Sequence, residues 1–165
     1  MKKSDLKKQD PEFLIELLIE LSKLNKENEA YLKSRISSNH NTLYTLYCKK
    51  IDKAFLSYEL MSLKDARRAL NDFKKSKPSN SKLIELYLYY IKRAYNLEKT
   101  DWRFQENFYS AIEKVYNVIF EILHNNSSLK DEYLDELIKM INISNEGWGH
   151  RDYLNEKLEE LLKKE

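Results

Sequence analysis

The chain has 165 residues, 42% of them hydrophobic and 34% charged, which is enough apolar material for one domain with a substantial core. Its 29 basic and 27 acidic residues give a formal net charge of +2, which argues against a general nucleic-acid binder. Two glycines, two prolines and the single cysteine Cys48 indicate an all-α fold without an internal disulfide. We expect one helical domain over residues 1–165, in the cytoplasm and not in a membrane.

The first third of the chain predicts three helices. Asp10 and Pro11 are suited to cap and open the first, whose apolar residues recur at spacings of three and four. These residues are Phe13, Leu14, Leu17, Leu18, Leu21 and Leu24. A second helix is expected over residues 27–36, followed by a polar loop over 37–41 and a third helix over about 42–60. The third helix should bury Leu43, Leu46, Ile51, Phe55 and Tyr58.

A capping box opens the fourth predicted helix. Ser62 stands three residues before Asp65, and the helix is expected to run to about Lys75. Residues 77–81 form the clearest break in the chain. The fifth helix, over about residues 82–97, is rich in aromatic residues and apolar over more than half its circumference, so we expect it to be central.

Three more predicted helices complete the chain. The sixth covers about residues 101–124, and a second capping box at Ser128 starts the seventh, which runs to about Ile143. Gly147, Trp148 and Gly149 are interpreted as a structural turn, in which the glycines supply positive φ angles and the indole folds back over the preceding helices. A last amphipathic helix carries Leu154, Leu158, Leu161 and Leu162.

Short joints between these helices favour antiparallel neighbours. We therefore expect an all-α architecture of about seven or eight helices, stacked as antiparallel hairpins. Both a closed bundle and a short superhelix fit this pattern.

Charge is unevenly distributed along the chain. Residues 62–82 carry seven basic and two acidic side chains, whereas residues 121–165 carry eleven acidic and six basic ones. Such a gradient can orient a partner, or bring the middle of one copy to the tail of another. The candidate partner-binding residues are Lys64, Arg67, Arg68, Lys74, Lys75 and Lys77.

Two terminal segments resemble a bacterial family of small helical proteins of unknown function. They are the opening residues 4–8 with the leucine-rich residues 13–21, and the closing Gly-Trp-Gly-x-x-Asp element over residues 147–152. Together they cover about a fifth of the chain, and Asp10-Pro11 departs from the leucine-rich half-turn expected there. The resemblance implies an α-helical, repeat-like domain and carries no catalytic residues.

Few residues suit catalysis. The three histidines, His40, His124 and His150, are far apart in sequence. Glu121 and His124 have the Glu-x-x-His spacing of di-iron bundles, but such a site needs the motif twice, so we expect neither a metal nor a cofactor. Arg35 and His40 have the Arg-x(4)-His spacing of small helical ribonucleases, in which an arginine stabilises charge on the phosphate and a histidine moves the proton.

Tyrosines beside the basic segment offer a nucleic-acid interpretation. Tyr87, Tyr89, Tyr90 and Tyr95 lie on one predicted helix, where exposed rings would stack on bases. Their helical spacing with leucines instead favours burial in the core.

The sequence therefore predicts a non-catalytic helical protein-interaction module. Its expected partner is another protein with an acidic surface, and a homo-oligomer is also compatible with the charge gradient. The alternatives are a ribonuclease using Arg35 and His40, and a nucleic-acid binder using residues 62–82.

Overall fold

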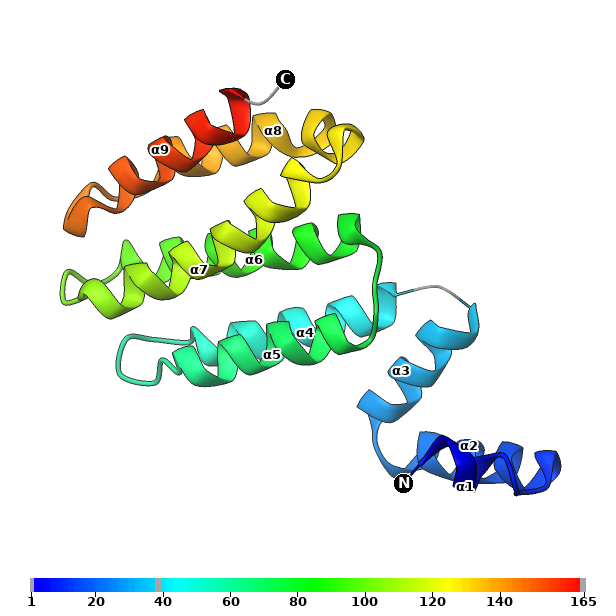
Figure 1. Ribbon diagram of the computed structural model, residues 1–165. Helices are drawn as coiled ribbons and strands as arrows, with labels where there is room; N and C mark the ends of the chain where they lie inside the picture. The colour runs from blue at the N-terminus through cyan, green and yellow to red at the C-terminus, as the bar shows by residue number, and fades with distance from the viewer. Residues whose placement is uncertain (1, 38–39, 164–165) are drawn as a thin grey trace. The chain divides into compact units, whose positions relative to one another are not determined.

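The computed structural model describes residues 2–37 and 40–163 of the chain and confirms the all-α prediction, since these residues form helices and no strand. The elements in chain order are α1 (Lys3–Leu6), α2 (Pro11–Leu24), α3 (Lys26–Ser37), α4 (Asn41–Ala54), α5 (Leu63–Lys75), α6 (Asn80–Glu98), α7 (Glu106–His124), α8 (Ser127–Asn142), the 3₁₀ turn η1 (Gly147–Gly149) and α9 (His150–Lys163) (Figure 1). Within those residues, none of the helices combines the length and the apolar character that crossing a bilayer requires.

The chain, which the sequence predicts to be one domain, consists of two compact units. The first ends at Leu46 and the second begins at Tyr47, so the division falls inside α4.

The first unit contains the predicted leucine-rich helix. Asp10 caps α2, because its Oδ2 accepts hydrogen bonds from the backbone N–H of Glu12 and Phe13 at 3.0 and 3.2 Å, and Pro11 occupies the first turn as predicted. None of the residues of α2 is buried, and six of its large apolar side chains are exposed. These are Phe13, Ile15, Leu18, Ile19, Leu21 and Leu24. The apolar stripe of α2 is thus not buried within the first unit.

The second unit consists of three antiparallel helix pairs. Figure 1 shows α4 with α5, α6 with α7, and α8 with α9 in successive rows, which is the predicted stack of hairpins. Phe55 packs edge-on against Tyr90 of α6 with ring centroids 5.0 Å apart, and Tyr47 of α4 lies 5.6 Å from Phe73 of α5. Helix α6 contributes ten buried residues, among them Tyr87 and Tyr90, so its predicted central position is confirmed.

Two predicted helices are too long. The third was expected to reach residue 60, but α4 ends at Ala54, whose carbonyl accepts a hydrogen bond from the Ser62 backbone N–H at 2.9 Å as the chain reverses. Tyr58 is therefore half-buried in the loop and donates to the Arg103 carbonyl at 3.3 Å. The sixth was expected from residue 101, but α7 begins at Glu106 because Asp101 Oδ1 accepts from the Arg103 backbone N–H at 2.8 Å and forms a turn instead.

The helix caps were predicted correctly at one of the two capping boxes. Ser62 Oγ accepts from the Asp65 backbone N–H at 3.2 Å and caps α5. At α8 the cap is Asn126, whose Oδ1 accepts from the Leu129 N–H at 3.1 Å, so that Ser128 lies inside the first turn. The prediction at Ser128 was wrong because asparagine two residues earlier is an equally good cap and the chain is already helical at Ser127.

Candidate functional site

Helix α5 presents one charged face because its other face is buried. Ala66, Ala69, Leu70 and Phe73 recur at spacings of three and four and are all buried, which fixes the rotation of the helix about its axis. The side chains on the opposite face point away from the core and include Lys64, Arg67, Arg68, Asn71 and Lys75.

Helix α7 forms the facing wall of a groove. Its buried residues, including Phe108, Ile112 and Val115, hold it in the core of the second unit. Toward α5 it presents Glu106, Asn107, Ser110 and Lys114, together with the buried Ala111. Small side chains at Ser110 and Ala111 leave space between the two helices, and the resulting groove has a volume of about 930 Å³.

The groove carries a strong positive charge. Five cations line it, namely Lys64, Arg67, Arg68, Lys75 and Lys114, against the two carboxylates of Asp72 and Glu106. Asp72 already accepts from Lys75 at 2.7 Å and lies 3.7 Å from Arg68. Within the described residues, the other three cations, Lys64, Arg67 and Lys114, form no ion pair. Their charge is therefore available to a ligand.

A smaller recess adjoins the groove and shares four lining residues with it. It has a volume of about 140 Å³ and lies between α5, α6 and α7. Arg67, Asn71, Ala111 and Lys114 line both the groove and the recess. The other lining residues are Leu70, Tyr87, Tyr90, Val115 and Val118. The interior is of low polarity: burial raises the pKa of Tyr87, and it raises the pKa of Tyr90 to about 12 against a smaller opposing effect of Arg67.

The structure brings together four of the six basic residues singled out from the sequence. Lys64, Arg67, Arg68 and Lys75 line the groove, whereas Lys74 and Lys77 do not. Lys77 lies beyond α5 with a φ of 55°, in the left-handed region. Lys114, forty residues away in sequence from Lys74, completes the set from α7.

No family model, curated protein or solved structure matches this chain. The resemblance to a bacterial helical family therefore stays a prediction. The functional argument rests on the geometry of the site alone.

The two residues of the ribonuclease alternative lie in the first unit. Arg35 is in the last turn of α3 and His40 directly precedes α4, half-buried. Ser38 and Asn39, which connect them, lie outside the described residues. The structure thus places Arg35 and His40 on either side of a helix junction.

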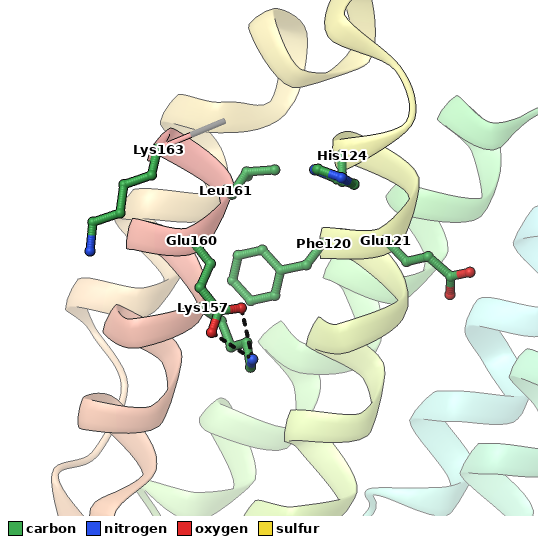
Figure 2. A pocket seen from close by; sticks show the side chains of 7 residues that line it. All are labelled: Phe120, Glu121, His124, Lys157, Glu160, Leu161 and Lys163. Carbon is green, nitrogen blue, oxygen red and sulfur yellow. Dashed lines mark hydrogen bonds and ion pairs between the residues drawn. The ribbon is translucent and has the colours of Figure 1, made fainter. Parts of the chain in front are cut away.

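The Glu-x-x-His pair borders a second pocket in the second unit. This pocket, of about 450 Å³, lies between α7 and α9. Figure 2 shows the Phe120 ring and Leu161 between the helices, while Glu121 extends away from them. Lys157 and Glu160, both on α9, form an ion pair at the edge of the pocket, with Lys157 Nζ 2.8 Å from Glu160 Oε2. Over residues 2–37 and 40–163, no group of three histidine, cysteine or acidic side chains is arranged to hold a metal ion.

A buried polar cluster surrounds His150, which the sequence analysis did not single out as a core residue. His150 is fully buried, with its Nδ1 2.9 Å from Glu113 Oε1 and its Nε2 2.9 Å from Tyr95 Oη. Tyr95 also donates to Tyr116 Oη at 3.3 Å, and the ring of Tyr109 lies 5.3 Å from the imidazole. One signal was present in the sequence, since His150 stands four residues before the buried Leu154. The cluster is closed to solvent at its centre and joins α6, α7 and α9.

Most of the tyrosines of α6 are packed in the core of the second unit. Tyr87, Tyr90 and Tyr95 are buried, and half-buried Tyr89 donates to Asp52 at 2.7 Å. Desolvation together with this contact raises the pKa of Tyr89 to about 12. These rings are not available for stacking on bases, as their helical spacing predicted.

The loops at one end of the second unit carry most of its exposed large apolar side chains; Leu162 of α9 is also exposed. Figure 1 shows the connections α4–α5, α6–α7 and α8–α9 at the same end of the helix rows. They carry Leu56 and Leu60, then Trp102 (91% exposed), then Ile143 and Trp148 (63% exposed). The predicted turn at 147–149 exists, but Trp148 itself has a φ of 57°, alongside Gly149 at 67°, and its indole does not fold back over the helices.

Proposed function

We propose that this protein is a non-catalytic interaction module that binds an acidic segment of another protein in the groove between α5 and α7. The observation that carries the proposal is the convergence of Lys64, Arg67 and Lys114 on one groove without an ion-pair partner among the described residues. Cations kept apart from the protein's own carboxylates attract and orient an oppositely charged partner.

Two further observations favour a protein over a nucleic acid. The tyrosines beside the basic segment are buried in the core or bonded to Asp52, so they offer no stacking platform. Five cations gather in one groove between two helices, in a chain whose net charge is only +2. A groove between helices is a common docking site for a partner helix or peptide.

The test uses two charge-reversed variants of the full chain. The groove variant is Lys64→Glu, Arg67→Glu, Lys114→Glu, which removes three cations that form no ion pair with a described residue. The control variant is Lys74→Glu, Lys77→Glu, Lys99→Glu, which makes the same change in net charge at exposed lysines outside the groove. Circular dichroism and thermal unfolding first establish that both variants fold.

Each protein is used to capture partners from a native lysate at two salt concentrations, and captured proteins are purified and their affinity is measured. We expect a defined partner that binds the wild type and the control variant, and binds the groove variant at least tenfold more weakly, a change of about 1.4 kcal/mol. Binding to RNA or DNA that the groove variant alone loses would refute the proposal. A dimer of this chain that the groove variant alone loses would make a second copy the partner.

A further inference from the structure

The groove and the recess together form a site with two chemistries. At the mouth of the recess, Arg67 of α5 and Lys114 of α7 lie with Asn71 and Ala111, and all four also line the groove. Below the mouth the walls are apolar or aromatic, provided by Leu70, Tyr87, Tyr90, Val115 and Val118. A ligand that fills both parts must be anionic along its length and apolar at one point.

The volume of the recess limits the size of the apolar side chain that can enter it. Its volume of about 140 Å³ is close to the roughly 150 Å³ of an apolar cavity that holds one benzene molecule. One phenylalanine or leucine side chain fits a space of this size, and an indole exceeds it. An apolar ligand alone would leave the two cations at the mouth desolvated, whereas carboxylates beside the apolar group pair with them.

The length of the groove suits a short helix. The lining residues of α5 extend from Leu63 to Lys75, which corresponds to about 18 Å at 1.5 Å per residue. That length accepts about three turns of a helix lying between α5 and α7. Carboxylates three or four positions from the apolar residue would lie on the same face of such a helix as the anchor.

We infer that the groove binds an acidic amphipathic helix with one phenylalanine- or leucine-sized side chain, which enters the recess between Arg67 and Lys114. This inference rests on the proposed function and adds the anchor and its size to it. Charge sets the orientation and the rate of encounter, and the anchor sets the specificity.

The test selects peptides from a displayed random library of 16-residue sequences on the full-length wild-type protein. Selected peptides are then synthesised and their affinities measured by fluorescence anisotropy. We expect acidic sequences with one recurrent phenylalanine or leucine. Replacing that residue with alanine should weaken binding at least tenfold, and the groove variant should bind the parent peptide at least tenfold more weakly than the wild type does.

Two recess variants separate the anchor from a general loss of structure. Ala111→Leu fills the recess and should weaken binding of the parent peptide. The peptide whose apolar residue is replaced by alanine should bind this variant almost as tightly as the parent peptide does. Val118→Ala enlarges the recess and should improve the affinity of a tryptophan version of the peptide relative to the phenylalanine version. A change of preference of this kind does not arise from partial unfolding.

The possible failures are distinguishable. Acidic peptides without a recurrent apolar position, or an alanine replacement that changes affinity less than threefold, would overturn the anchor and leave the proposed function intact. Selected peptides that are not acidic, or that bind the groove variant as well as the wild type, would overturn both. A library that yields no peptide binding in the groove would also overturn both.

Discussion

Removal of the His150 imidazole should destabilise the second unit strongly. The side chain is 0% exposed and contacts three tyrosine rings, those of Tyr95, Tyr109 and Tyr116, with centroids 5.3 to 6.5 Å away. Both ring nitrogens have partners at 2.9 Å, on α6 and on α7. His150→Ala therefore removes packing and two hydrogen bonds at the point where three helices meet.

The size of the effect follows from these contacts. Truncating a buried ring to alanine leaves a cavity, which costs about 2–3 kcal/mol for a side chain somewhat smaller than phenylalanine. The loss of the Tyr95 contact adds about 1 kcal/mol, because that hydroxyl keeps its bond to Tyr116. Glu113 is partly exposed and regains water, so its side adds little. The expected loss in the free energy of unfolding is about 3–4 kcal/mol.

Urea unfolding at neutral pH, followed by circular dichroism, measures this loss. His124→Ala is the matched control, because His124 is exposed at the end of α7 and its removal should change the free energy of unfolding by less than about 0.5 kcal/mol. A double-mutant cycle with Tyr95→Phe should give a coupling of about 1 kcal/mol. A loss below about 1 kcal/mol for His150→Ala would refute the view that this cluster holds α6, α7 and α9 together.

Three further predictions concern pH and helix caps. The pKa of Tyr90, raised from 10 to about 12, implies that folding favours its neutral phenol. This contribution to stability is complete below pH 10, and about 3 kcal/mol is lost as pH rises through 12. Urea unfolding at increasing pH should show the decline, and Tyr90→Phe should reduce it. Asn126→Ala should lower stability by about 1 kcal/mol, while Ser128→Ala should have no effect, and the opposite order in thermal unfolding would contradict the observed cap. Asp10→Ala should speed amide exchange in α2 about fivefold, and unchanged exchange would contradict its capping role.

The basic wall of the groove could be predicted from sequence, and its partner wall could not. On α5 the buried alanines, Leu70 and Phe73 define one face by their spacing, so the opposite side was expected to carry the cations. Lys114 gives no comparable signal, because its place opposite α5 depends on how α6 and α7 fold back on the first hairpin. The recess is still harder to predict from sequence, since residues of α5, α6 and α7 form it together.

The errors have local and tertiary causes. Residues 55–60 contain no helix breaker, and α4 ends at Ala54 because Phe55 packs on Tyr90 and the Ser62 N–H bonds back to the Ala54 carbonyl. The sequence analysis weighs His150 only among the three candidate catalytic histidines and does not predict it as a core residue. Its buried position depends on partners from α6 and α7 that only the folded chain supplies.

The exposure of both tryptophans has a consequence for how this protein is followed in solution. Trp102 and Trp148 lie in loops at the same end of the second unit and contact water already in the folded state. Their emission should therefore be red-shifted in the native protein and should change little on denaturation. The same two indoles are well placed to report a molecule that covers this end of the unit, because only such an event would move them into an apolar environment.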